Sequence, residues 1–416
     1  MSAPGETTSL LAEPVEPVGR RFVVAITLAN LGIMIAFFTP IQNLLPRLAE
    51  SVAPDGKEAA LGWITGVGAL VSIIANPAAG ALSDRTTSRL GRRKPWVLYG
   101  ALLGALGILA LALQSTVLGL AVAWGVCQAT INGAYAGVTA TIPDQVPVRQ
   151  RGVVSGWVGI AQVLGVVIGV ALVSFAVTGL TGGIVLTAVL FVLLVLPFVL
   201  RLHDPRLSPD APPPLSLTRF LTQFWVSPRA HPDFAWAWVT RFLVSLGNAL
   251  ATLYLLFFLT DAVQVENPEQ AQALVILAYA VGCIVTAVYS GRLSDRSGRR
   301  KIYVVVSSLV MASSAFILAF VPTFTATLVA GLILGLGYGV YLAVDQALIT
   351  QVLPAAADRG RDLGVINIAN AAPQVLAPVI AAPIVTGSTG YVGLYVLTGL
   401  VTILSAVLVR NIRSVP

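Results

Sequence analysis

Charged side chains are scarce in this chain. Only 10% of its 416 residues are Asp, Glu, Lys or Arg, whereas soluble domains usually carry roughly 25%. Hydrophobic residues make up 56% of the sequence, and the mean hydropathy is +0.87. This composition excludes an ordinary soluble protein and indicates a protein embedded in a membrane.

Cysteine and histidine are also rare, with two of each. Cys127 and Cys283 lie in apolar runs, so they supply neither a disulfide framework nor a metal site. We expect both to be small buried side chains, and we expect no metal and no cofactor. A cleavable signal is not expected either, because residues 1–19 are polar and the apolar run after them is too long.

The apolar runs do not alternate with polar residues, which excludes an outer-membrane barrel. Two of them, 182–200 and 304–321, contain no charge, and each is close to the roughly 20 residues of a membrane-spanning helix. The sequence therefore predicts an all-α integral membrane protein. Its twelve expected spans are 22–46, 59–82, 95–114, 117–142, 153–177, 181–200, 234–260, 270–292, 302–321, 324–352, 363–386 and 391–409.

The spans fall into two sets of six. We expect an N-terminal tail over 1–21, a six-helix bundle over 22–200, a linker over 201–233, a second bundle over 234–409 and a tail over 410–416. The linker is rich in proline and polar residues. Within it, the stretch LTRFLTQFW predicts a short amphipathic helix on the membrane surface.

Basic residues gather on one side of the predicted spans. All but three of the 25 lie in the tails, the linker or the loops of that side. Arg47 and Lys57 lie on the other side, and Arg241 lies inside a span. The positive-inside rule places both termini and the linker in the cytoplasm. It also accounts for the isoelectric point near 9.7 without any nucleic-acid partner.

The two halves resemble each other in sequence. Gly80 and Asp84 recur as Gly291 and Asp295, and Thr139 in the fourth span corresponds to Asp345 in the tenth. Six spans followed by a repeated set of six is the layout of secondary transporters, and an enzyme has no need of it.

The repeated charged string follows the second span of each half. It reads GALSDRTTSRLGRRKP from Gly80 and GRLSDRSGRRK from Gly291. This Gly-x-x-x-Asp-Arg…Gly-Arg-Arg pattern resembles the signature of the major facilitator superfamily. That resemblance covers nearly the whole chain, and it implies two pseudo-symmetric six-helix bundles and transport by alternating access.

The first copy also resembles the sucrose and glycoside–pentoside–hexuronide branch of that superfamily, through its Ser-Asp-x-x-Thr-Ser-Arg-x-Gly-Arg-Arg-x-Pro pattern. Sucrose carriers of this kind share an acidic residue inside the fourth span. Here that span has none, and Gln128 and Asn132 are its polar groups in that region. A proton site, if the protein uses protons, is therefore expected elsewhere.

The charged strings predict a cytoplasmic latch between the halves. Asp84 ends a helix whose C-terminus already carries partial negative charge, so it needs a positive partner. We expect that partner to be the N-terminus of the span starting near Leu363, and the span starting near Val153 for Asp295. The latch set is Gly80, Asp84, Arg85, Gly91, Arg92, Arg93, Gly291, Asp295, Arg296, Gly298, Arg299 and Arg300. The alternative is that the arginines only fix topology.

Two ionisable residues lie inside spans, Arg241 in the seventh and Asp345 in the tenth. They share a depth, and the resemblance implies that these two spans are neighbours facing the central cavity. We therefore expect an ion pair. Intramembrane charges are functional candidates by default, and this carboxylate could alternate between a proton and the arginine. The alternative is a fixed structural salt bridge.

Polar and aromatic residues of the spans that would line the cavity are the candidate substrate ligands. They are Asn30, Phe37, Phe38, Gln42, Gln128, Asn132, Tyr135, Asn248, Tyr254, Tyr338, Tyr341, Gln346, Asn367, Asn370 and Gln374. Phe37 and Phe38 precede Pro40, where we expect a kink. Sugars need paired hydrogen bonds and an apolar stacking face, which these side chains supply. The alternative for each polar member is a hydrogen bond between helices.

These observations predict a monomeric, bacterial-type inner-membrane transporter for proton-coupled symport of a neutral polar solute, such as a sugar or glycoside. Its partners would be that solute, protons and the lipid bilayer. Alternatives are a proton-driven exporter of amphipathic compounds, a sugar uniporter and a non-transporting membrane receptor or assembly subunit. An aromatic, apolar cavity would favour export, and a ring of amides would favour sugar.

Overall fold

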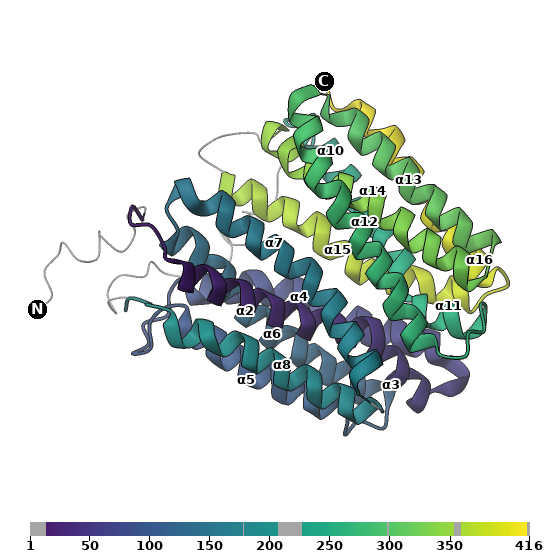
Figure 1. Cartoon of the computed structure of the whole chain (residues 1–416), viewed down its shortest axis with the longest axis horizontal. Coiled ribbons are helices and arrows are strands. Elements are labelled where there is room, and N and C mark those ends of the chain that lie inside the picture. Colours follow the sequence, from purple (N-terminus) through teal and green to yellow (C-terminus); the bar gives the residue numbers. More distant parts are fainter. Residues whose placement is uncertain (1–13, 178, 207–226, 298, 353–358, 414–416) are drawn as a thin grey trace, which may run out of the picture. The chain divides into compact units, whose positions relative to one another are not determined.

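A computed structural model describes residues 14–177, 179–206, 227–297, 299–352 and 359–413. The described part of the chain contains 12 helical segments that are long and apolar enough to cross a membrane, as the sequence predicts (Figure 1). The chain is therefore a multi-pass membrane protein. The amphipathic helix expected in LTRFLTQFW lies outside the described residues.

The chain divides into two compact units. The first comprises residues 1–55 and 67–214, and the second comprises 56–66 and 215–416. In order along the first half, the elements are α2 (Arg20–Thr39), η1 (Pro40–Leu44), α3 (Leu45–Val52), η2 (Pro54–Gly56), α4 (Lys57–Ser83), α5 (Lys94–Leu111), α6 (Val117–Gln145), α7 (Val148–Ala171), η3 (Leu172–Ala176) and α8 (Leu180–Arg201).

The second half has a matching order. Its elements are α10 (Pro232–Leu253), α11 (Leu255–Asp261), α12 (Pro268–Ser297), α13 (Arg300–Phe320), α14 (Phe324–Val352), α15 (Arg359–Val385), α16 (Gly390–Leu408) and η4 (Val409–Asn411). The bounds of the predicted domains stay a prediction, because the structural division assigns the segment 56–66 by packing and not by order along the chain.

Helix packing repeats from one unit to the other. In the first unit α2 packs on α7 and α8, and α5 packs on α6 and α8. In the second unit α10 packs on α15 and α16, and α13 packs on α14 and α16. Each pairing in one set has its counterpart in the other, so the sequence repeat corresponds to two bundles of the same architecture.

The predicted span limits agree with the helices to within a few residues. The largest differences are at the end of the first span, which extends to Val52 and not 46, at the start of α7, which begins at Val148 and not 153, and at the end of α12, which extends to Ser297 and not 292. The kink expected at Pro40 stays a prediction, and the helical span continues through this residue. The five residues Pro40–Leu44 form a π-helical turn, which accommodates the missing N–H of proline within a continuous span.

Glycines set the contact between α12 and α14. A Cβ placed on Gly331, Gly335 or Gly339 would collide with Val275, Tyr279 or Cys283 respectively. Both series advance by four residues, one helical turn at a time, so the two helices run in parallel with their backbones in close approach. This contact fixes Tyr279 of α12 against α14.

The start of α4 packs within the second unit. Lys57 Nζ lies 2.8 Å from Asp261 Oδ1 at the end of α11 and 4.9 Å from the ring centroid of Phe257. Tyr391 of α16 donates a hydrogen bond to the other oxygen of Asp261, and the Tyr254 hydroxyl donates to the carbonyl of Glu58. One continuous helix therefore contributes to both compact units.

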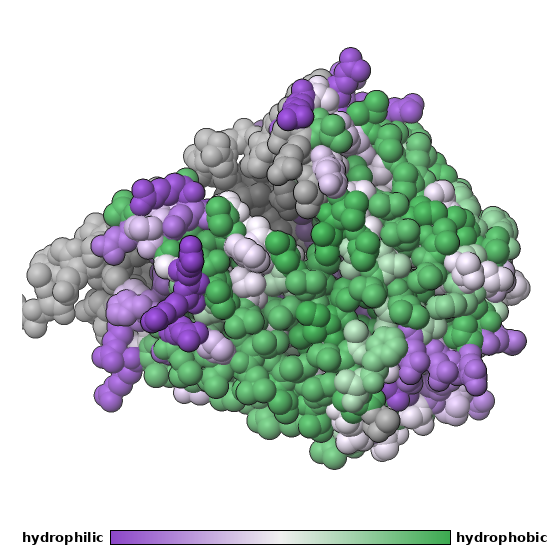
Figure 2. Space-filling view, in the orientation of Figure 1, coloured by the Kyte–Doolittle hydropathy of each residue, from purple (hydrophilic) through white to green (hydrophobic). Residues whose placement is uncertain are grey.

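Hydrophobic side chains also cover the outer surface of the helices. Trp63, Leu118 and Leu193 are among the large apolar residues that are well exposed. Figure 2 shows apolar residues over the sides of the helices and hydrophilic residues near helix ends. Such a surface fits a lipid environment, because lipid tails do not penalise exposed apolar groups.

Candidate functional site

The second unit brings Arg241 and Asp345 together. Arg241 Nη1 on α10 lies 2.9 Å from Asp345 Oδ2 on α14, and each residue is only 5% exposed. An isolated buried charge is strongly unfavourable, so each side chain needs the other. The ion pair expected from the sequence is therefore present in the structure.

A neutral acceptor completes the surroundings of the arginine. Asn370 of α15 accepts a hydrogen bond from Arg241 Nε at 2.8 Å, and Ser245 Oγ lies 3.4 Å from the same oxygen. Nearby, Trp238 Nε1 donates to the carbonyl of Val365 at 2.9 Å, while its ring stacks on Phe242. These contacts fix the register of α10 against α15, so the guanidinium is held between α14 and α15.

Three tyrosines extend from this pair. Tyr338 and Tyr341 stack at 5.9 Å between ring centroids, and Tyr279 stacks on Tyr338 at 6.2 Å. The hydroxyl of Tyr279 donates to Asn248 Oδ1 on α10 at 3.1 Å. On α14, positions 338, 341 and 345 share one helical face. The aromatic row therefore links Asn248 to the buried ion pair.

Tyr279 was not among the residues expected from the sequence. Its span, the eighth, was not one of those expected to line the cavity. The signal that could have found it is the glycine spacing of Gly331, Gly335 and Gly339, which indicates a closely packed face on α14. The spacing does not say which helix packs there.

The predicted amide ligands of the first unit bond to one another. Asn132 Nδ2 lies 2.8 Å from the carbonyl of Gln128 and 3.0 Å from Ser72 Oγ. Asn76 Nδ2 donates to Asn132 Oδ1 at 3.2 Å. These bonds join α4 to α6, which is the alternative role, an interhelical hydrogen bond, considered for each of them.

Other predicted cavity residues of the first unit also have protein neighbours. Asn30 Nδ2 donates to the carbonyl of Ile26 on its own helix, and Gln42 is buried in η1. Phe37 makes an edge contact with Tyr135, whose hydroxyl accepts a hydrogen bond from Gln162 Nε2. Phe38 is half-buried.

Two described ligands predicted for the second unit, Tyr254 and Gln374, are not part of the cluster. Tyr254 lies at the junction of α10 and α11 and bonds to the backbone of Glu58. Gln374 is exposed. The side chains of Gln346 and Asn367 lie outside the described residues.

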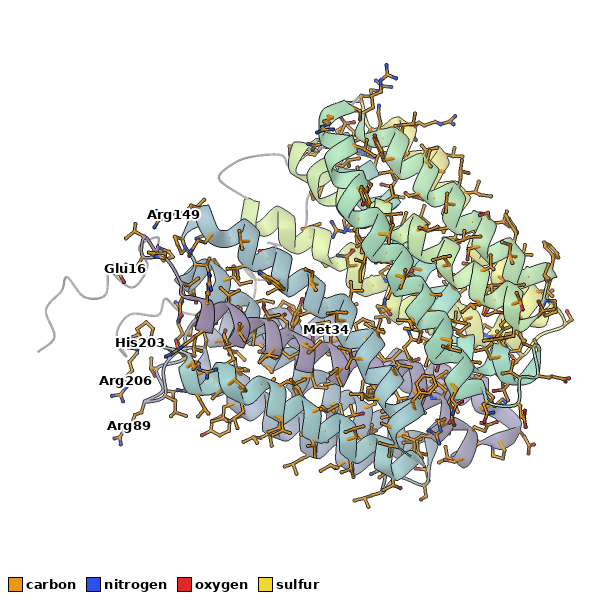
Figure 3. The ribbon with its side chains drawn as sticks, viewed as in Figure 1. Glu16, Met34, Arg89, Arg149, His203 and Arg206 are labelled. Carbon is orange, nitrogen blue, oxygen red and sulfur yellow. The ribbon has the colours of Figure 1, made fainter. Side chains whose placement is uncertain are left out.

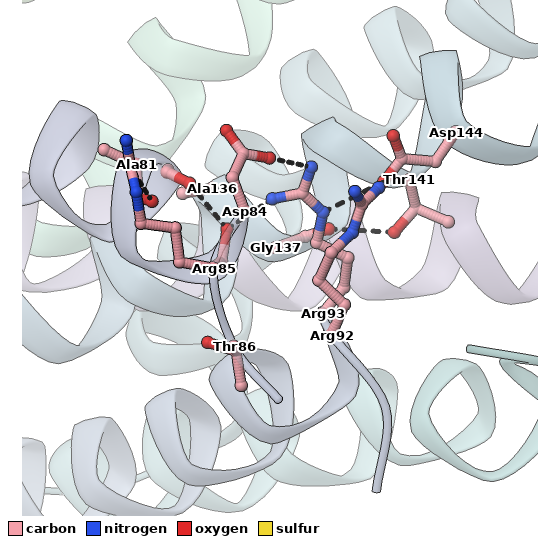
Figure 4. Close-up of polar contacts among 12 residues, drawn as sticks. Ala81, Asp84, Arg85, Thr86, Arg92, Arg93, Ala136, Gly137, Thr141 and Asp144 are labelled. Atoms are coloured by element: carbon pink, nitrogen blue, oxygen red, sulfur yellow. Dashed lines mark hydrogen bonds and ion pairs between the residues drawn. The ribbon is translucent and has the colours of Figure 1, made fainter. Parts of the chain in front are cut away.

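A second charged site lies at the end of α4 in the first unit (Figure 4). Arg93 contacts Asp84 and Ser83, and its Nε lies 2.9 Å from Asp144 Oδ2. Arg92 Nη2 lies 2.6 Å from the same Asp144 oxygen. We call Asp84, Arg92, Arg93 and Asp144 the charge network. It ties the α4–α5 loop to the end of α6.

Two members of the predicted latch have different surroundings. Arg85 Nη1 donates to the carbonyl of Ala81 one turn earlier. A Cβ built on Gly80 would have no described atom within 4 Å. The contact expected between Asp84 and the span starting near Leu363 stays a prediction, because the side chain of Leu363 lies outside the described residues.

The linker docks on this network through Asp204. Its Oδ2 accepts hydrogen bonds from the backbone N–H groups of Arg93 and Lys94, at 2.5 and 2.6 Å, and so caps the N-terminus of α5. Gly91 has φ +108°, and a Cβ there would lie 2.5 Å from Asp204. Sequence reasoning missed Asp204 and Asp144, although both follow the spans that end beside this loop.

Charged side chains gather at this end of the first unit. Figure 3 shows Arg89, Arg149, His203 and Arg206 at the same end, with Glu16 nearby, while Met34 lies farther along the bundle. Arg206 Nε donates to the carbonyl of Arg89. The clustering fits the side predicted to be cytoplasmic.

The second copy of the string is described in part. α12 continues to Ser297, so Asp295 and Arg296 lie in its last turn. Arg296 and Arg299 are exposed, and Arg300 is half-buried. Gly298 and the side chain of Asp295 lie outside the described residues, as does the environment of Gly291.

The repeated six-helix architecture, the twelve spans and the repeated signature define a secondary transporter. The sequence matches the family described as Major Facilitator Superfamily over residues 21–269 and 266–416. The chain therefore belongs to the major facilitator superfamily, whose members are transporters and not enzymes.

Individual relatives are distant. A General alpha-glucoside permease of Schizosaccharomyces pombe is 31% identical over 108 residues, which is 26% of this chain. The aligned part spans only 19% of that relative.

Solved structures resemble the fold over nearly the whole chain. A variant of the nucleoside transporter NupG has a TM-score of 0.75 at 12% identity, covering 94% of this chain and 100% of its own. A POT family transporter in complex with a thioalcohol-conjugated peptide has 0.75 at 13%, covering 94% and 95%. The human organic anion transporter MFSD10 has 0.69 at 17%, covering 95% and 100%. At these identities the likeness shows the fold alone.

Proposed function

We propose that this protein is a proton-coupled symporter of a neutral polar solute such as a sugar or glycoside. The observation that carries the proposal is the Arg241–Asp345 ion pair, buried in the second unit with Nη1 and Oδ2 2.9 Å apart. A carboxylate in such a place costs free energy unless it is paired, and functional proton sites of transporters have this character.

The proposed cycle uses the two states of this carboxylate. With Asp345 ionised, the guanidinium is neutralised by its partner. A proton on Asp345 weakens that pair and leaves N–H donors of Arg241 available for hydroxyl oxygens of the solute. Release of the proton restores the pair and withdraws those donors, so proton and solute travel in the same direction.

The choice of substrate rests on the chemistry of this site. Among the described span residues, Asp345 is the one carboxylate beside Arg241, and it neutralises the guanidinium. The ion pair therefore has no surplus positive charge, which disfavours a strongly anionic substrate. Amide and tyrosine side chains near the pair can form hydrogen bonds with the hydroxyl groups of a sugar and pack against the apolar face of its ring. The permease relative is named for an alpha-glucoside, which supports the same class of solute.

The aromatic row favours a second candidate function. Tyr279, Tyr338 and Tyr341 stack into a continuous surface, and Trp238 stacks on Phe242 close to Arg241. Such a surface suits an amphipathic compound with a planar apolar part. Proton-driven export of such compounds would use the same ion pair.

The test is the substitution Asp345→Asn in liposomes. We expect uphill uptake driven by an inward proton gradient to be lost, while exchange of labelled for unlabelled solute continues, because an amide cannot carry a proton through the cycle. Solutes are first chosen from a panel of sugars and glycosides by thermal-shift binding. Asp55→Asn, in the short turn before α4, is the matched control and keeps both activities.

Retained uphill uptake in Asp345→Asn would rule out this carboxylate as the coupling site. Accumulation of amphipathic dyes inside the liposomes while protons leave down an outward gradient, with no sugar uptake, would favour the exporter. Sugar equilibration that ignores the proton gradient would indicate a uniporter. We also propose the bacterial inner membrane as the location, with both termini in the cytoplasm.

A further inference from the structure

Arg241 is held by two acceptors of different kinds. Asp345 on α14 binds Nη1 and can lose its charge by taking a proton, whereas Asn370 on α15 binds Nε and stays neutral. The sequence suggested Asn370 as a substrate ligand. In the structure its side-chain oxygen lies instead 2.8 Å from Arg241 and 3.4 Å from Ser245 Oγ.

We propose that Asn370 is a positioning residue, whose oxygen keeps the guanidinium of Arg241 in place when a proton neutralises Asp345. The inference rests on the proposed coupling function of the pair. Without a second acceptor, protonation would leave a buried cation facing a neutral acid, which is strongly unfavourable. Asn370 lowers that cost, so the protonated state is easier to reach.

The surroundings leave Asp345 as the group that changes charge. Titratable groups along the helices packed around the pair are Tyr279, Cys283 and Tyr289 on α12, Tyr303 on α13, Tyr338 and Tyr341 on α14, and Tyr391 and Tyr395 on α16. The charged residues of α12 and α13 lie near the ends of those helices, at Glu269, Arg292, Asp295, Arg296, Arg300 and Lys301. Tyrosine and cysteine ordinarily ionise well above neutral pH. The charged residues of α15 precede Leu363, and Asp233 of α10 lies in the first turn of that helix.

Two substitutions at one position should act in opposite directions. Asn370→Leu removes the neutral acceptor, which penalises the protonated state more than the ion-paired state, so Asp345 should bind its proton only at lower pH. Asn370→Asp adds a carboxylate beside Asp345. Repulsion between the two acids should make the first proton bind at higher pH.

The measurement is the infrared signal of the protonated carboxyl group of purified protein in lipid nanodiscs. It is recorded against pH, and the spectrum of Asp345→Asn is subtracted. We expect the midpoint to move by about one pH unit, a tenfold change in proton concentration, downward for Asn370→Leu and upward for Asn370→Asp. The control is Gln114→Leu, which removes an amide that lies in the turn after α5 and donates to the carbonyl of Ala110, and it leaves the midpoint in place.

The outcomes separate this inference from the function on which it rests. A wild-type spectrum without any signal assignable to Asp345 would overturn the proposed coupling role and this inference with it. A clear wild-type signal whose midpoint is the same in both Asn370 variants would overturn this inference alone. Asn370→Asp keeps the shape of the side chain, so it decides the question even if Asn370→Leu does not fold.

Discussion

At the scale of single residues, Arg241 shows how a charge is accommodated among apolar helices. Its side chain is buried, and Asp345 and Asn370 supply acceptors from two other helices. Removing either acceptor leaves the buried guanidinium of Arg241 with fewer hydrogen-bond and ion-pair partners. Substitutions at Asp345 and Asn370 are therefore expected to change proton binding as well as stability.

Gly91 gives a prediction at the same scale. Gly91→Ala should destabilise the first unit by about 1–3 kcal/mol. The residue has φ +108°, which a side chain adopts only with strain, and the added Cβ would lie 2.5 Å from Asp204. The measurement is the free energy of unfolding by denaturant titration in detergent micelles.

The matched control for this change is Gly19→Ala. Gly19 has φ −79° and nothing within 4 Å of a built Cβ, so its substitution should leave the free energy of unfolding close to the wild-type value. Equal stability of the Gly91 and Gly19 variants would contradict the role given to the Asp204 contact.

At the scale of elements, the pairing of α12 with α14 positions the candidate site. Gly331, Gly335 and Gly339 face Val275, Tyr279 and Cys283 turn by turn. Because the backbones approach so closely, Tyr279 reaches both the ring of Tyr338 and the amide of Asn248.

Gly335→Ala should therefore disturb both packing and the aromatic row. Its Cβ would lie within 1.9 Å of the carbonyl oxygen of Tyr279, so the helices would have to separate. Overpacking of this kind costs about 1–3 kcal/mol, and we expect a lower melting temperature and a changed near-ultraviolet circular dichroism of the tyrosines.

Gly159→Ala in the interior of α7 makes the same chemical change where a Cβ meets nothing within 4 Å. It should not lower the melting temperature. If the Gly335→Ala and Gly159→Ala variants have the same melting temperature, close packing of α12 on α14 is not what positions Tyr279.

At the scale of the whole molecule, the two bundles repeat the same helix pairings but differ in their polar interiors. The first has bonded amides, Asn76 and Asn132, between α4 and α6, whereas the second has an ion pair between α10 and α14. Thr139, the counterpart of Asp345, donates to carbonyls of its own helix. Among the described residues, the ion pair buried inside the spans therefore belongs to one half of the repeat.

Asp84 tests whether the charge network acts on this frame as a latch that closes the cytoplasmic side. Asp84→Asn removes the charge that binds Arg93, although Asp84 itself is 56% exposed. We expect a cysteine at Thr139 to react faster with maleimide from the cytoplasmic side, and one at Thr252 to react more slowly from outside. Cys127 and Cys283, both buried, are first replaced by alanine.

Asp55→Asn again serves as the matched change, and its reactivities should equal those of the parent. Unchanged labelling of both cysteines in Asp84→Asn would leave the network with a purely local role, joining the α4–α5 loop to α6.

The sequence by itself determined that the chain spans a membrane, the twelve spans and the repeat, and the family resemblance added the prediction of the Arg241–Asp345 pair. Apolar runs of bilayer length that do not alternate with polar residues leave the backbone no alternative to helices. The pair was expected because the resemblance implies that the seventh and tenth spans are neighbours. Span limits were least certain where polar residues continue a helix beyond the apolar run, as at the start of α7 and the end of α12.

Only the tertiary structure decided which polar groups form hydrogen bonds with one another. Asn370 bonds Arg241, Tyr279 bonds Asn248, and Asp204 caps α5. Each of these bonds joins residues far apart in the chain. The sequence pattern of an amide inside a span is the same whether its side chain faces a solute or another helix. Composition and spacing indicate that a polar group is buried, whereas its partner depends on how the helices pack.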